Sequence, residues 1–78
     1  MFLITIGNDF PTQEHKGLDM EEVKRSAKAL LDEDFAITIW DAEDLTPLLR
    51  AEGRSFTLLA HPRQTEAVPI MRFLVTGE

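Results

Sequence analysis

Cysteine is absent from this chain of 78 residues, so disulfides, thiolate metal sites and a cysteine nucleophile are excluded. The sequence also lacks a P-loop and a G-x-G-x-x-G motif, and neither Ser26 nor Ser55 lies in a G-x-S-x-G motif. His15 and His61 lie in loops without an evident acid–base partner, and we interpret His61, which precedes a proline, as a turn residue. No cofactor and no catalytic residue are therefore predicted.

Long hydrophobic runs are also missing. The opening segment Phe2–Ile6 is apolar, but it is far too short to span a membrane and has no basic region before it of the kind found in signal peptides. We therefore expect a cytoplasmic protein that does not bind membranes. With a hydrophobic content of 44%, the chain is expected to fold as one domain over residues 1–78.

Basic residues are few, with 8 Lys and Arg against 14 Asp and Glu and a net charge of −6. Eleven acidic and four basic residues lie between Asp9 and Asp44, a net −7, whereas the chain from Leu45 onward carries +1. Direct binding to nucleic acid is disfavoured, because affinity for phosphates comes mainly from clustered Lys and Arg. We expect a basic protein or protein complex as the partner; the alternative is that the charge serves solubility alone.

An amphipathic helix is the clearest element in the sequence. Asp19 and Glu22 form the D-x-x-E variant of a capping box, and Leu18 before the cap can pack on Val23 as a hydrophobic staple. Apolar residues then recur at helical spacing, which predicts a helix over Met20–Leu31 with one buried face. The residues of that face are Met20, Val23, Ala27, Leu30 and Leu31.

β-Branched and aromatic residues indicate strands at Phe2–Ile6 and Phe35–Trp40, on either side of this helix. A strand–helix–strand order favours a right-handed crossover with the two strands parallel. Further strands are predicted at Ser55–Ala60 and Ile70–Thr76, paired as an antiparallel hairpin. A short helix is predicted before them, with Thr46 or Asp44 as its cap, Pro47 at its first position and Gly53 just past its end. The expected fold is a small α+β single-domain sandwich in the order β-α-β-(short α)-β-β, with one main helix packed on a mixed sheet of three to four strands.

One face of this predicted sheet is too apolar to lie bare in water. Either the predicted short helix covers the face, or a second molecule does. In the second case the protein is a homodimer with Trp40 as an interface anchor. The residues that define this dimer or packing surface are Trp40, Leu59, Ile70 and Leu74.

Parallel pairing of the first two strands would gather carboxylates at one edge of the sheet. Asp9 follows the first strand, and Asp41, Glu43 and Asp44 follow the second. Open α/β sheets usually hold ligands at this edge, and carboxylate oxygens are ligands that Mg²⁺ accepts. Helix capping and solvation explain the same acids without a metal, so no metal site is predicted.

Asp32, Glu33 and Asp34 lie at the C-terminal end of the predicted helix, where the helix dipole disfavours anions. This departure from the usual charge pattern indicates a functional surface; the alternative is a frayed last turn with its carboxylates in water. A six-residue strand separates these acids from Asp41 by a distance on the order of 20 Å. Partner binding is therefore predicted at two separate groups, which are Asp32, Glu33 and Asp34, and Asp41, Glu43 and Asp44.

The sequence as a whole favours a non-catalytic acidic protein-binding module. Its carboxylates would stand in for phosphates and block a basic nucleic-acid-binding groove, as a phage-type inhibitor of a host nuclease or defence complex would do. One alternative is a structural homodimer or assembly subunit that uses the Trp40 face. A second alternative is a small metal-dependent enzyme.

Overall fold

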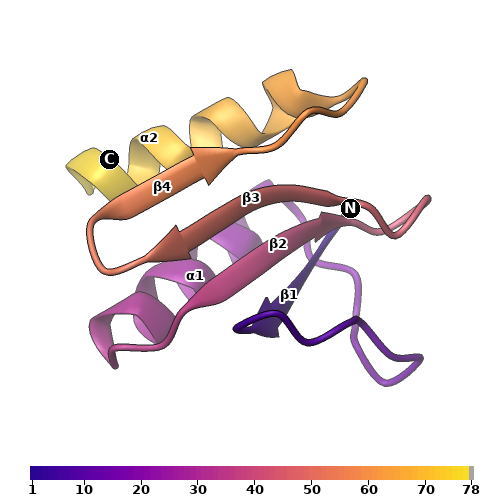
Figure 1. Cartoon of the computed structure of the whole chain (residues 1–78), viewed down its shortest axis with the longest axis horizontal. Helices are drawn as coiled ribbons and strands as arrows, with labels where there is room; N and C mark the ends of the chain where they lie inside the picture. The colour runs from indigo at the N-terminus through magenta and orange to yellow at the C-terminus, as the bar shows by residue number, and fades with distance from the viewer. Residues whose placement is uncertain (78) are drawn as a thin grey trace.

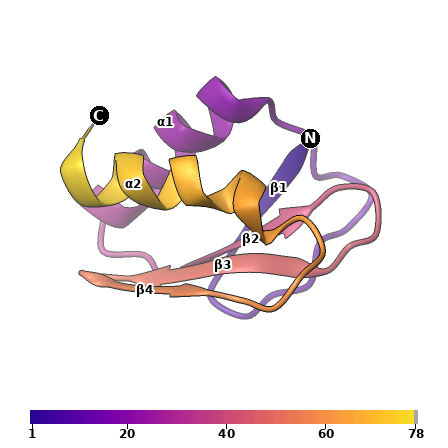
Figure 2. The same ribbon diagram turned by 90° about the horizontal axis from the view of Figure 1, so that it is seen from above.

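Both helices lie on the same face of a four-stranded antiparallel sheet in the computed structural model, which describes residues 1–77 (Figures 1 and 2). The strands follow one another across the sheet in the order β1-β2-β3-β4. The predicted α+β class is confirmed, but the sheet is antiparallel throughout rather than mixed. Within residues 1–77, no helix has the length and apolar character that crossing a membrane requires. The elements are β1 (Phe2–Ile6), α1 (Met20–Asp32), β2 (Ile37–Asp41), β3 (Pro47–Glu52), β4 (Ser55–Leu58), η1 (Gln64–Ala67) and α2 (Val68–Thr76).

The predicted capping box at the start of α1 is confirmed. The Asp19 carboxylate accepts a hydrogen bond of 2.8 Å from the Glu22 N–H, and the Glu22 carboxylate accepts one of 3.3 Å from the Asp19 N–H. Two N–H groups that the helix itself leaves without partners are thereby satisfied. Val23 and Ala27 are fully buried, so the apolar face of α1 packs as the spacing predicts.

The prediction that β1 and β2 are parallel is wrong, because Phe2 lies opposite Asp41 and Ile6 lies opposite Ile37. The crossover rule assumes that the helix starts where the first strand ends. Here the loop over 7–17 first carries the chain back to the start of β1, where Phe2 and Leu18 exchange backbone hydrogen bonds of 2.8 and 2.7 Å. The helix α1 then leads to the other end of the sheet, so β2 returns antiparallel to β1.

A strand, β3, occupies the segment predicted as a short helix. Pro47 is the first residue of this strand, a position that proline tolerates in a sheet as well as in a helix. A register shift between Ile39 and Trp40 opposes two residues of β3 to one of β2, so Leu48 and Leu49 are both buried. This bulge breaks the alternation of apolar and polar residues that would have indicated a strand in the sequence.

A helix, α2, replaces the predicted fourth strand, and β4 pairs with β3 instead of with a later segment. Ala67 and Ile70 are fully buried, and Met71 and Leu74 pack against the same core, so the inward positions follow helical spacing. In the predicted strand Ile70–Thr76, Val75 would share the inward face with Met71 and Phe73, but Val75 is 61% exposed. The helix ends at Gly77, whose φ of 81° suits a left-handed cap.

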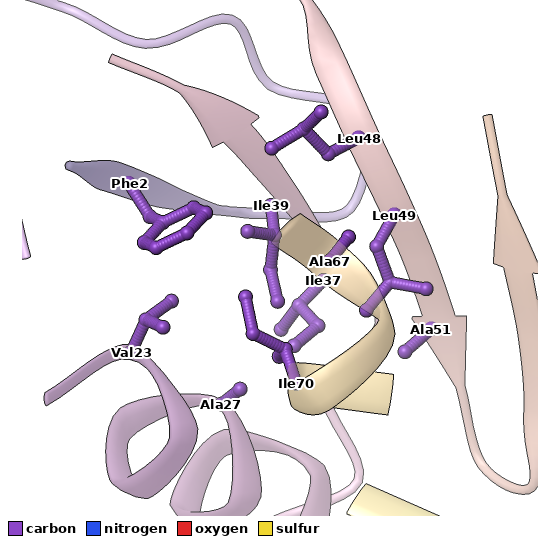
Figure 3. Packing of buried hydrophobic residues seen from close by; sticks show 10 residues of the cluster. All are labelled: Phe2, Val23, Ala27, Ile37, Ile39, Leu48, Leu49, Ala51, Ala67 and Ile70. Carbon is purple, nitrogen blue, oxygen red and sulfur yellow. The ribbon is translucent and has the colours of Figure 1, made fainter. Parts of the chain in front are cut away.

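The main core fills the space between the two helices and the sheet (Figure 3). Side chains from every element except β4 meet there fully buried, and side chains of β4 pack at its margin. The buried members of this core are Phe2, Val23, Ala27, Ile37, Ile39, Leu48, Leu49, Ala51, Ala67 and Ile70.

The opposite face of the sheet is covered in part by the loop over 7–17. The Phe10 ring meets Trp40 edge-on at 5.1 Å between centroids, and Trp40 is only 6% exposed. The Trp40 Nε1–H donates a hydrogen bond of 2.8 Å to the Thr5 hydroxyl, and the Thr38 hydroxyl donates one of 2.7 Å to the Gly7 carbonyl. Part of this face is therefore covered by the loop over 7–17, and not by a short helix or a second molecule as predicted.

Candidate functional site

The two predicted acidic groups lie at opposite ends of β2. Asp34 precedes this strand and Asp41 is its last residue. Asp9 lies at the same end as Asp34, because the Gly7 N–H donates a 2.6 Å hydrogen bond to the Ala36 carbonyl just before β2 begins. Asp9 and Asp41 are thus held apart, and the carboxylates that parallel strands would have gathered are not brought together.

The group after β2 forms a closed cluster around one guanidinium. Arg63 Nε lies 2.8 Å from Asp41 Oδ2, its Nη1 lies 2.9 Å from Glu43 Oε2, and its Nη2 lies 3.4 Å from Asp44 Oδ2. The Asp41 side chain is only 8% exposed, so its charge depends on this partner. The carboxylate of Glu43, and then the charge of Asp41, hold the pKa of Arg63 above its usual value. We call Asp41, Glu43, Asp44, His61 and Arg63 the Arg63 cluster.

His61 belongs to this cluster, although the sequence reading found no partner for it. Its Nδ1 accepts a 2.9 Å hydrogen bond from the Arg63 N–H, so the proton of the neutral ring lies on Nε2. Nε2 in turn lies 3.1 Å from Asp44 Oδ2. The side chain is 3% exposed, and both ring nitrogens have hydrogen-bond partners within the chain.

The loop between β2 and β3 is shaped by the same carboxylates. Asp41 accepts a 2.8 Å hydrogen bond from the Glu43 N–H, and Asp44 accepts bonds of 2.6 and 3.2 Å from the Thr46 hydroxyl and N–H. The Thr46 hydroxyl, followed by its N–H and by His61, lowers the pKa of Asp44 below its usual value. Leu45 takes a positive φ of 56°, a conformation that this bonding holds in place.

A metal ion at this cluster fits poorly. Ligand atoms of Asp41, Asp44 and His61 lie within 4.8 Å of one another, which is the spacing that a metal site needs. However, the Arg63 guanidinium already fills the space between the two carboxylates. Metal binding by His61 Nε2 would also move the ring proton to Nδ1, which already accepts the Arg63 N–H. The cluster is therefore a structural tie between the β2–β3 loop and the segment before η1.

Sequence reasoning missed Arg63 because its partners lie about 20 residues away. Local contacts of Arg63 include the bond from its N–H to His61, two residues away, and the 4.0 Å ion pair with Glu66, three residues away. Bringing Asp44 to this turn requires the hairpin of β3 and β4, and that hairpin was predicted as helix followed by strand. No spacing in the sequence indicates the contact.

The group before β2 ends α1 in an ordered cap rather than a frayed turn. Asp34 has a left-handed φ of 67°, its N–H donates to the Leu31 carbonyl at 3.0 Å, and the Phe35 N–H donates to the Leu30 carbonyl at 3.1 Å. These are the two hydrogen bonds of a Schellman motif. Asp32 also lies 3.5 Å from Lys28. The carboxylates are therefore held on a fixed turn.

Three carboxylates at this end have no basic neighbour. Within residues 1–77, the side chains of Asp9, Glu33 and Asp34 form no ion pair and no hydrogen bond, and all three residues are exposed. Ile6 and Phe35 at the same end are 42% and 41% exposed. We call Asp9, Asp32, Glu33 and Asp34 the acidic end.

The four residues of the predicted dimer or packing surface do not share one face. Trp40 lies under Phe10, and Leu59 is half-buried after β4. Ile70 is fully buried in the main core, where Leu74 packs against it from the same helix. The structure therefore uses at least three of these residues for contacts within the chain.

Two hollows lie on the sheet face opposite the helices. One, of about 190 Å³, includes Asn8, Thr38, Arg50 and Thr57 in its lining. The other, of about 330 Å³, lies between the loop over 7–17 and the β2–β3 loop, with Leu3, Pro11, Ala42 and Leu45 among its lining residues. Neither includes a residue of the Arg63 cluster, so neither adds a reactive group to it.

Comparison with protein-family models, with curated proteins and with solved structures found no match to this chain.

Proposed function

We propose that this protein is a non-catalytic binding module that presents its acidic end to a basic protein. The observation that carries the proposal is the group of unpaired carboxylates, Asp9, Glu33 and Asp34, beside the exposed side chains of Ile6 and Phe35. Carboxylates without an internal cation are available to Lys and Arg of another molecule. Exposed apolar side chains between them supply the contact area that charge alone does not.

The Arg63 cluster narrows this proposal to one end of the molecule. Asp41, Glu43 and Asp44 were predicted as a second contact for the partner, but all three face Arg63 within 3.4 Å. A partner cation would have to displace an ion pair that also holds the β2–β3 loop. The acidic end requires no such displacement, and it is the surface that we assign to the partner.

A nucleic-acid-binding protein is the partner class that the chemistry favours. Such proteins carry clustered Lys and Arg that meet phosphates, and carboxylates on a rigid turn can meet the same side chains. An inhibitor that blocks a basic groove of a nuclease or defence complex would work in this way, in the cytoplasm where such targets lie. The proposal of a homodimer through Trp40 is weaker, since Phe10 already covers that side chain.

The test compares two double variants with the same net charge. Glu33→Lys with Asp34→Lys changes the acidic end, while Glu14→Lys with Glu21→Lys changes two exposed acids away from it. Affinity for a fluorescent oligoarginine peptide is measured by anisotropy at low and high salt. The first variant should bind more weakly than the second and have a shallower salt dependence, because it loses specific contacts. Equal losses in both variants would mean that only net charge matters.

A further inference from the structure

β1 is an edge strand without the usual protection. Among residues 1–77, β2 is the only strand that pairs with β1, and on the other side of β1 Leu18 pairs with Phe2 alone. Natural edge strands commonly carry charges, proline or a bulge that prevents pairing with other chains. The sequence Phe2–Ile6 contains no charged residue and no proline, and its register with β2 is regular along its whole length.

The free side of β1 offers backbone groups for pairing. Along an antiparallel strand, the N–H and C=O of successive residues point alternately to either side. Those of Phe2 point away from β2, since both bond to Leu18. The same groups of Ile4 and Ile6 therefore also point away from β2, and in the part of the chain that the structure describes only the Ile6 carbonyl among them has a partner, the Asp9 N–H at 3.2 Å. The N–H and C=O of Ile4 and the N–H of Ile6 therefore remain available to another strand.

The side chains around the free edge of β1 indicate which residues an added strand should carry. On the helix side, Ile4 is half-buried and Ile6 is 42% exposed, so apolar side chains at alternate positions of an added strand would find apolar neighbours. At the end of the strand stand the unpaired carboxylates of Asp9, Glu33 and Asp34. An extended segment that alternates apolar and basic residues matches both features.

We propose that β1 accepts an extended basic segment of a partner protein as a fifth strand of the sheet. This inference rests on the proposed function and adds the mode of binding, which is strand addition. The opposite edge, β4, is shorter, and Arg50 and Arg54 on its hairpin form no ion pair within residues 1–77, so it repels a basic segment. A second copy of this chain, with its charge of −6, is repelled at the acidic end.

The experiment uses an alternating Lys-Val peptide and variants of Ile6. Ile6→Pro removes the free N–H, and the ladder to β2 is preserved because that N–H points away from it. Ile6→Ala is the matched control, since it loses the same side chain but keeps the N–H. Affinity for the peptide should fall about threefold to tenfold further in Ile6→Pro than in Ile6→Ala, which is the effect of one hydrogen bond. Equal affinities of the two variants would overturn strand addition.

A second measurement on the unaltered chain keeps the test valid if Ile6→Pro does not fold. Amide hydrogen exchange by NMR should slow at Ile4 and Ile6 when the Lys-Val peptide is added, while Leu3 and Thr5, already paired with β2, should change little. A Lys-Val peptide that is N-methylated at its valines should bind weakly and give no such protection. Unchanged exchange at Ile4 and Ile6 with the bound peptide would contradict the proposal.

The outcomes separate this inference from the proposed function. If both peptides bind alike and Glu33→Lys with Asp34→Lys abolishes binding, the acidic end is functional but strand addition is wrong. If neither the plain nor the N-methylated Lys-Val peptide binds, and a Glu-Val peptide does not bind either, both the proposed function and strand addition are wrong. If light scattering shows that the chain itself dimerises and Ile6→Pro makes it monomeric, the edge serves a second copy, and the basic segment is overturned.

Discussion

Arg63 shows at the scale of single residues how one cation can determine the availability of three carboxylates. Its guanidinium lies within 3.4 Å of Asp41, Glu43 and Asp44, so three acids that follow β2 closely in the sequence are already paired. Glu33 and Asp34, which look similar in the sequence, have no such partner. Charge density along a chain therefore does not by itself identify a binding surface.

Replacement of Arg63 by Gln should lower the melting temperature by several degrees. The change leaves Asp41, whose side chain is 8% exposed, with a charge that no cation compensates. Arg72→Gln is the control, because Arg72 is exposed and forms no ion pair within residues 1–77. Thermal unfolding followed by circular dichroism checks the difference, and similar melting temperatures for both variants would contradict a structural role for the Arg63 cluster.

Asp34→Gly should stabilise the fold by roughly 0.5–1 kcal/mol. Asp34 has a φ of 67°, which glycine adopts without a steric penalty, and the change also removes an anion from the C-terminal end of a helix dipole. Asp34→Ala removes the same charge but keeps the steric penalty, so its gain should be smaller or absent. Urea unfolding of the three proteins measures the effect. A stabilised Asp34→Gly that binds a basic partner less well would indicate that the acid is kept for function.

At the scale of elements, α2 is the part of the fold that is easiest to test. Ile70→Ala should lower the free energy of unfolding by about 2–5 kcal/mol, because the side chain is fully buried in the core. Val75→Ala should change it little, since Val75 is 61% exposed. A strand in this segment would place Val75 in the main core, so Val75→Ala would then cost about as much as Ile70→Ala. Urea unfolding of both variants therefore distinguishes the helix from the strand predicted by the sequence pattern.

The elements that the sequence predicts correctly are those with local signals. The capping box of Asp19 and Glu22 and the helical spacing of Val23 and Ala27 are complete within a few residues, and α1 follows from them. β3 has no such signal, because the bulge opposite Ile39 buries two successive leucines and hides the alternation. The segment Ile70–Thr76 alternates as a strand would, but it forms a helix that has Pro69 in its first turn and Gly77 as its cap, and that packs on α1 and η1.

The candidate site depends on pairing that no local pattern contains. The six carboxylates were predicted as two separate groups, and β2 does hold the two groups at opposite ends, but Arg63 already pairs with all three acids of the second group. The direction of β2 relative to β1 decides which acids are neighbours. That direction follows from the path of the loop over 7–17, a polar segment in which the sequence offers only Pro11 and Gly17 as signals.

At the scale of the whole molecule, acid should destabilise the fold. The hydrogen bond from the Glu22 N–H lowers the pKa of Asp19, and the Thr46 hydroxyl lowers that of Asp44. A carboxyl whose pKa is lower in the folded state contributes stability above its ordinary pKa of 3.8 and loses it as the pH falls through the folded value. The urea concentration at the unfolding midpoint should therefore decrease when the pH is lowered below about 4. Asp44→Asn should weaken this dependence, and a midpoint that rises with acid would contradict the prediction.

The order of strands in the sheet also has a consequence for how the chain folds. β2, β3 and β4 are joined by short turns, so their pairing closes only small loops, whereas Phe2 meets Asp41 across almost half of the chain. The entropy of loop closure makes local hairpins form readily and delays distant pairing. β1 is therefore the last strand to join the sheet and the first to leave it. When it leaves, the edge of β2 becomes available in its place, so transient opening of the N-terminal strand would itself create a second site for strand exchange.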